Sequence, residues 1–107
     1  MSKTRQKIKE IIREYKKVLF DLGIHVERVI LFGSFTKGNP RRDSDIDLVV
    51  ISNDFAKLNL RERLEILGMA AARIMRPIEA KGYTEKEIKS ATPASFLEEV
   101  LVTGVRI

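Results

Sequence analysis

The chain has 107 residues, a formal net charge of +5 and no cysteine. This length fits one domain spanning residues 1–107, and the lack of cysteine excludes disulfides, thiolate metal sites and cysteine nucleophiles. No apolar run approaches the roughly 18 to 20 residues of a membrane span, and no signal-peptide core begins the chain. We therefore expect a cytoplasmic protein that does not enter a membrane.

The first expected element is an amphipathic helix over about residues 4–22. Its apolar residues recur at intervals of three and four, and Gly23 supplies a stop signal. Residues 1–21 carry seven basic and three acidic side chains (Lys3, Arg5, Lys7, Lys9, Arg13, Lys16 and Lys17 against Glu10, Glu14 and Asp21). This polar side is either a solvated helix face or a patch that attracts nucleic acid, ATP or an acidic protein. We expect the single histidine, His25, to be a loop residue rather than a catalytic one.

Two strands are expected next, Val26–Phe32 and Ile46–Ile51. Both runs are rich in β-branched or aromatic residues and are bounded by turn formers. Their connection is short and contains Gly38-Asn39-Pro40, so an antiparallel pair is easier to form than a parallel crossover. This pairing would bring the end of the first strand, followed by Gly33 and Ser34, next to the start of the second.

The second half of the chain predicts a helix over about 58–75, a strand over Pro77–Lys81 that Gly82 closes, and two further helices. The apolar positions of the helix over 58–75 are Leu60, Leu64, Leu67, Ala71, Ile74 and Met75. Gly68 and the alanines that follow it suggest that this helix packs closely on the sheet. Thr84 and Glu87 form a capping box for a brief helix to about Ser90. Thr92-Pro93 begins the last helix, which Gly104 ends. The predicted fold class is α/β (α+β), with a small mixed sheet of about three strands packed against helices.

Three acidic residues are candidates for a metal site. Asp45 and Asp47 point to one face of the second strand while Ile46 points into the core. Two adjacent carboxylates repel each other unless a cation lies between them, and Mg²⁺ takes oxygen ligands. Glu79, in an otherwise apolar short strand, would complete a three-carboxylate site able to hold two Mg²⁺ ions. The simpler alternatives are a solvated aspartate pair at a strand start and an ordinary glutamate on a strand edge.

The joint pattern of Leu31-Phe32-Gly33-Ser34, a basic linker and Ser44-Asp45-Ile46-Asp47 closely resembles the minimal nucleotidyltransferase family of the DNA polymerase β-like superfamily, over about residues 26–81. The resemblance implies a nucleotidyltransferase fold and an ATP–Mg²⁺ site. It implies that Glu79 also helps to deprotonate the attacking hydroxyl, although aspartate is common at that position. By this resemblance, Gly33 and Ser34 would bind the β- and γ-phosphates, and Asp45, Asp47 and Glu79 would hold the metal ions. Lys37, Arg41 and Arg42 would neutralise phosphate charge; the alternative is that these three are only surface charges.

The activity that this resemblance implies is transfer of AMP from ATP to a hydroxyl group, with pyrophosphate as the leaving group. A chain of this length leaves little room for an acceptor pocket, so we expect a partner to present the acceptor. By resemblance to antitoxins paired with HEPN-type toxins, the partner would be a small helical toxin modified on a tyrosine. The alternatives are a non-catalytic antitoxin that neutralises its partner by binding, a nucleic-acid binder acting through the basic helix, and transfer to a small molecule. The acceptor, the base specificity and the oligomeric state are left open.

Overall fold

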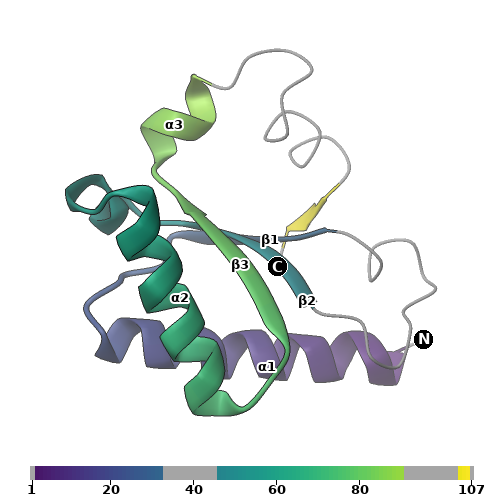
Figure 1. Cartoon of the computed structure of the whole chain (residues 1–107). Coiled ribbons are helices and arrows are strands. Elements are labelled where there is room, and N and C mark those ends of the chain that lie inside the picture. The colour runs from purple at the N-terminus through teal and green to yellow at the C-terminus, as the bar shows by residue number, and fades with distance from the viewer. Residues whose placement is uncertain (1, 33–45, 91–103, 107) are drawn as a thin grey trace.

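A computed structural model describes residues 2–32, 46–90 and 104–106 (Figure 1). Its elements are a mixture of helices and strands. In chain order they are α1 (Ser2–Asp21), β1 (Arg28–Phe32), β2 (Ile46–Ile51), the 3-10 helix η2 (Asn53–Lys57), α2 (Leu60–Ile74), β3 (Ile78–Tyr83), α3 (Glu85–Lys89) and β4 (Val105–Arg106). The helix predicted from Pro93 lies outside these described residues.

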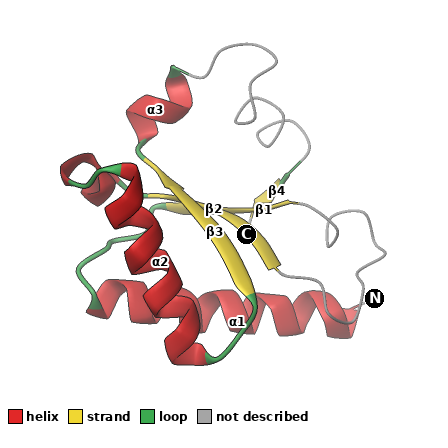
Figure 2. Ribbon diagram, in the orientation of Figure 1, coloured by secondary structure: helices red, strands yellow, loops and turns green. Residues whose placement is uncertain are grey.

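The strands form one mixed sheet in the order β3-β2-β1-β4 (Figure 2). β1 pairs antiparallel with β2, as the short connection predicts, and β2 pairs parallel with β3 through the α2 crossover. β4 pairs antiparallel with β1 and is a fourth strand that the sequence did not predict, because a two-residue strand carries no readable alternation. The predicted mixed sheet packed against helices is therefore confirmed.

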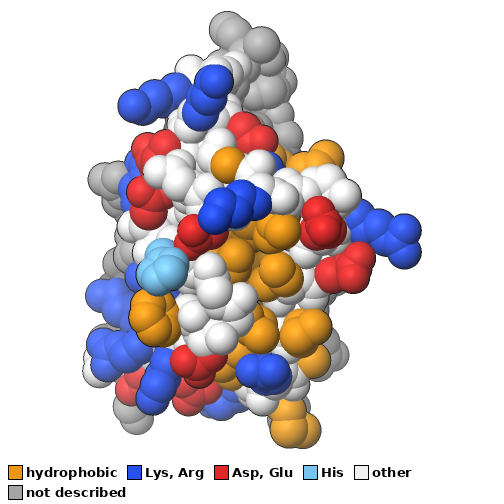
Figure 3. All heavy atoms as spheres, turned by 90° about the vertical axis from the view of Figure 1, so that its left-hand side faces the viewer, with side chains coloured by type: hydrophobic (Ala, Val, Ile, Leu, Met, Phe, Trp, Pro, Cys, Tyr) orange, Lys and Arg blue, Asp and Glu red, His pale blue; other side chains and the backbone are white. Residues whose placement is uncertain are grey.

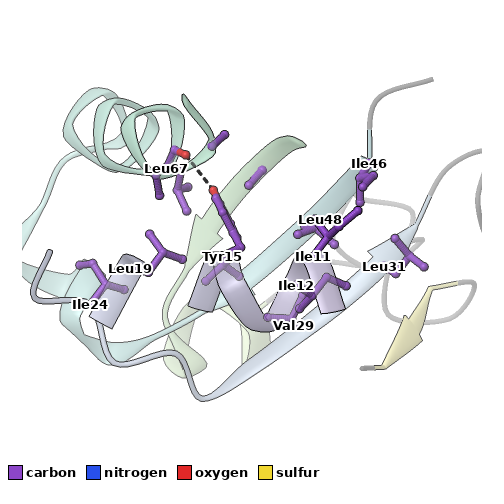
Figure 4. Close-up of a cluster of buried hydrophobic side chains, with 14 of the residues drawn as sticks. Ile11, Ile12, Tyr15, Leu19, Ile24, Val29, Leu31, Ile46, Leu48 and Leu67 are labelled. Carbon is purple, nitrogen blue, oxygen red and sulfur yellow. Dashed lines mark hydrogen bonds between the residues drawn. The ribbon is translucent and has the colours of Figure 1, made fainter. Parts of the chain in front are cut away.

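The main core lies between one face of the sheet and helices α1 and α2. Alternate residues of each strand point to this face, among them Val29 and Leu31 from β1 and Leu48 and Val50 from β2. Tyr15 of α1 is fully buried and its hydroxyl donates a 2.8 Å hydrogen bond to the carbonyl of Leu67 in α2, which ties the two helices together (Figure 4). The opposite face carries a smaller cluster of Ile30, Val49, Ile51 and Ile88.

Helix α1 confirms the predicted amphipathic pattern. Ile8, Ile12 and Leu19 face the core, while the basic side is turned outward and includes exposed Lys9 and Lys17. Gly23 has a φ of 94°, a left-handed conformation that glycine adopts without strain. The amide of the next residue, Ile24, donates to the carbonyl of Leu19 at 2.8 Å and so closes the helix. The predicted stop at Gly23 is thus correct.

No helix in the described part of the chain has the apolar length needed to cross a membrane.

Helix α2 is rotated relative to the prediction. Leu60, Leu64 and Met75 were expected to be apolar positions facing the core, but they are 66%, 56% and 87% exposed. Hydrophobic side chains gather on this side of the molecule, which Figure 3 views. Leu67, Ala70 and Ala71 are buried against the sheet, as predicted, and Arg63 is unexpectedly buried with them. Gly68 is exposed, so the expected close packing at this glycine is wrong.

Strand β3 continues two residues beyond its predicted end. Gly82 lies inside the strand, where it pairs with Val50, and its lack of a side chain makes room for the ring of buried Phe55: a Cβ built on Gly82 would lie 2.7 Å from the Cε2 and Cζ atoms of Phe55. The predicted capping box that starts α3 is confirmed, with Thr84 Oγ1 accepting from the amide of Glu87 at 3.1 Å and the Glu87 carboxylate accepting from the amide of Thr84 at 2.8 Å.

Candidate functional site

A row of paired residues crosses the sheet where β1 ends and where β2 and β3 begin. Phe32, the last residue of β1, pairs with Asp47, the second residue of β2. Asp47 in turn pairs with Glu79, the second residue of β3. Because paired residues on neighbouring strands point to the same face, the two carboxylates lie side by side on one face of the sheet. The structure therefore brings together two predicted site residues that are 32 positions apart in the chain.

The acidic pair lies on the face of the sheet away from α1 and α2. Its chain neighbours Ile46, Leu48 and Ala80 point into the main core on the other face. Asp47 is half-buried and Glu79 is exposed. The strand backbone fixes the spacing of the pair, which is a more rigid support than a loop would provide.

The donor atoms of this pair suit a hard divalent cation. Two neighbouring carboxylates repel each other when both are ionised, and an ion such as Mg²⁺ removes this repulsion while gaining oxygen ligands. Within residues 2–32, 46–90 and 104–106, no group of three or more His, Cys, Asp or Glu side chains is placed to hold a metal. The described part of the site thus supplies two of the three predicted ligands. The other predicted site residues, Gly33, Ser34, Lys37, Arg41, Arg42 and Asp45, lie outside the described residues.

A further charged residue on the same face was not among the predicted site residues. Lys81 follows Glu79 by two positions in β3, is exposed, and pairs with Val49. The alternation Glu79-Ala80-Lys81, in which the small apolar residue points to the core, is the signal that could have identified it.

His25 lies at the far end of β1 from the acidic pair. It is exposed, its Nδ1 atom lies 2.9 Å from Asp54 Oδ2, and its ring meets the Phe20 ring edge-on at a centroid distance of 5.0 Å. The same carboxylate oxygen accepts from the His25 amide at 2.7 Å, and these hydrogen bonds hold the pKa of Asp54 below its ordinary value. His25 thus acts in a surface contact between the α1–β1 connection and η2.

The mixed sheet thus has α1 and α2 on one face and a carboxylate pair, at the start of β2 and β3, on the other. The family model for the nucleotidyltransferase domain matches residues 5–101, so the chain belongs to this family. The resemblance seen in the sequence is thereby confirmed.

Two curated relatives come from Methanocaldococcus jannaschii. "Putative protein adenylyltransferase MJ1379" is 37% identical over 94 residues, which cover 81% of this chain and 93% of the relative. "Putative protein adenylyltransferase MJ0141" is 32% identical over 105 residues, which cover 92% of this chain and 96% of the relative. A solved structure described as a toxin-antitoxin with AMP-PNP superimposes with a TM-score of 0.62 and 24% identity, covering 88% of this chain and 69% of that one. At this identity the superposition supports the fold alone.

Proposed function

We propose that this protein is a Mg²⁺-dependent adenylyltransferase that moves AMP from ATP to a hydroxyl group of a partner protein. The observation that carries the proposal is the pairing of Asp47 with Glu79 on adjacent strands of a nucleotidyltransferase fold. Two relatives that span nearly this whole chain carry the name of protein adenylyltransferases, which supports a protein as the acceptor.

In the proposed reaction, Asp45, Asp47 and Glu79 hold the metal ions, which would polarise the α-phosphate and stabilise the charge that develops during transfer. The acceptor oxygen forms a bond to the α-phosphorus while the bond from that phosphorus to the pyrophosphate oxygen breaks. Pyrophosphate leaves with the electron pair, and Glu79 assists removal of the hydroxyl proton. Gly33 and Ser34 would bind the β- and γ-phosphates, and Lys37, Arg41 and Arg42 would offset their charge.

For the partner we propose a small helical toxin of the HEPN type, silenced by AMP on a tyrosine. A structural neighbour of this chain is described as a toxin-antitoxin, which favours an antitoxin role in the cytoplasm, where ATP is available. The test is incubation of the protein with labelled ATP, Mg²⁺ and the product of the neighbouring gene. Label should transfer to the partner with the wild-type protein and not with Asp45→Asn/Asp47→Asn. Equal labelling by that double variant, or none by the wild type, would reject the catalytic mechanism.

A second candidate is neutralisation of the partner by complex formation without catalysis. The observation that favours it is the exposed apolar surface of Leu60 and Leu64 on α2 and of Met75, which caps the helix; this surface is free for a protein contact. This candidate predicts that Asp45→Asn/Asp47→Asn still neutralises the partner, whereas Leu60→Ser/Leu64→Ser does not. The catalytic proposal predicts loss of neutralisation with the aspartate variant.

A further inference from the structure

Helix α1 separates the charges of its outward surface into two sides. With 3.6 residues per turn, positions 9, 13, 16 and 20 fall on one line along the helix. This line carries three cations and an aromatic ring: Lys9, Arg13, Lys16 and Phe20. The acids of the helix fall on the other outward side: Glu10, Glu14 and Asp21. Lys17 lies between the two sides.

The three cations of this line, hereafter the basic row, are available to an external anion. Lys9 and Arg13 are exposed and Lys16 is half-buried. None of the three forms an ion pair within the part of the chain that the structure describes. Like charges four positions apart, as in Lys9 and Arg13, repel each other and weaken a helix, whereas alternating charges would strengthen it. The row therefore does not serve the stability of α1, and this favours a role in binding.

Phe20 ends the basic row with an aromatic ring that is 58% exposed and lies outside both core clusters. The ring meets the His25 ring edge-on at a centroid distance of 5.0 Å. His25 is fixed in turn, because its amide donates to Asp54 Oδ2 at 2.7 Å. The Phe20 ring is thus held in place at the end of the row. Exposed aromatic rings beside a basic surface stack on unpaired bases of any sequence.

We propose that the basic row and Phe20 bind a single-stranded nucleic acid, an inference that is independent of the proposed transfer reaction. The helical rise separates successive members of the row by roughly 4.5 to 6 Å, and the phosphates of a strand recur at intervals of the same order. The cations can therefore follow the backbone while Phe20 stacks on a base. A stacked base must be unpaired, which favours a single strand over a duplex. An acidic protein would satisfy the cations but gives the exposed ring no flat partner.

The test is fluorescence anisotropy of a labelled oligouridylate titrated with the whole protein at increasing salt, without ATP or Mg²⁺. With three phosphate contacts to a single strand, the logarithm of the association constant should fall against the logarithm of the salt concentration with a slope of about −2. Lys9→Gln should reduce the slope to about −1.4, and Lys9→Gln/Arg13→Gln to about −0.7. Phe20→Ala should weaken binding roughly 5- to 100-fold at an unchanged slope, because it removes stacking and no charge.

Lys7→Gln is the matched control for Lys9→Gln. It removes the same charge from the same helix, but Lys7 is exposed on the side that carries Glu10 and Glu14. This variant should bind oligouridylate with the wild-type slope. Equal effects of Lys7→Gln and Lys9→Gln would show a general effect of net charge and would overturn the inference.

Three further outcomes would overturn it. Absence of binding at low salt would show that the basic row is only a solvated surface. Tighter binding of a duplex of the same length, or no effect of Phe20→Ala, would show that no base stacks on the ring. Binding of poly-glutamate with equal affinity and the same dependence on the row would indicate a face for acidic proteins instead. None of these results bears on AMP transfer, which is measured separately with ATP and the partner.

Discussion

Arg63 of α2 and Glu87 of α3 form an ion pair with an Nη1–Oε1 distance of 2.8 Å, in which the arginine side chain is 7% exposed and the glutamate side chain 41%. The same guanidinium group donates to the carbonyls of Phe55, Leu58 and Gly82 at 3.1 to 3.2 Å. One buried cation therefore joins η2, α2, β3 and α3.

Removing this cation should strongly destabilise the fold. Arg63→Ala removes one hydrogen-bond donor from each of three carbonyl groups and the ion-pair partner of Glu87, so we expect the free energy of unfolding to fall by about 2–4 kcal/mol. Urea unfolding followed by circular dichroism measures this. Arg61→Ala is the control: its pair with Glu65 lies on the same helix at 3.4 Å, but the arginine is 90% exposed, and the loss should be under about 0.5 kcal/mol. Equal losses in the two variants would contradict this account.

The pH dependence of stability should contain a contribution from Glu87. The hydrogen bond from Arg63 lowers the pKa of Glu87 below its ordinary value of 4.5, and the amide of Thr84 adds to this effect. A lowered folded-state pKa gives stability that is present above pH 4.5 and is lost as the pH falls through the folded-state pKa. The difference in melting temperature between wild type and Glu87→Gln should therefore shrink below pH 4.5. A difference that stays constant from pH 7 to pH 3 would contradict this.

Two glycines should respond in opposite ways to alanine. Gly82→Ala places a Cβ against the buried ring of Phe55 and should destabilise the protein by about 1–3 kcal/mol through overpacking. Gly68→Ala adds a methyl group in open space within α2 and should stabilise it by about 0.5–1 kcal/mol, because alanine has the better helix propensity. Thermal melts of the two variants test both signs. A destabilising Gly68→Ala would show that this face of α2 is covered in solution.

Loss of either carboxylate of the acidic pair should reduce AMP transfer without unfolding the protein. Asp47→Asn and Glu79→Gln each remove a proposed metal ligand, and we expect the transfer rate to fall at least about 100-fold at fixed Mg²⁺. Transfer of label from ATP to the partner measures this. Glu65→Gln, which neutralises an exposed acid on α2, should transfer at the wild-type rate. Normal transfer by Glu79→Gln alone would remove this residue from the site.

The sequence predicted the elements that position the site because their signals are local. The apolar run Ile46–Ile51 is bounded by polar residues, and the structure has the strand at these bounds. The Thr84–Glu87 capping box and the Gly23 stop are likewise decided within a few residues. The pairing of Asp47 with Glu79 depends on one further inference, the parallel crossover through α2.

The face of α2 could not be read in the same way. Two helical stripes share Leu67, Ala71 and Ile74: one continues to Leu60 and Leu64, and the other to Arg63. Periodicity alone favoured the stripe with the leucines as the buried one, because leucine is apolar and arginine is charged. Arg63 is buried because its acceptors Gly82 and Glu87, 19 and 24 residues further along the chain, surround it after folding. The contact between Phe55 and Gly82 is also distant in sequence, so Gly82 was taken as the end of β3 although the strand continues beyond it.

The parallel pairing of β2 and β3 also determines when the acidic pair comes into existence. Asp47 and Glu79 meet only after η2 and α2 have crossed from one strand to the other, a non-local closure that forms more slowly than a hairpin. During synthesis on the ribosome, a nascent chain that ends before β3 has the first carboxylate without the second. The metal site proposed for this pair is therefore complete only after β3 has been translated and has joined the sheet.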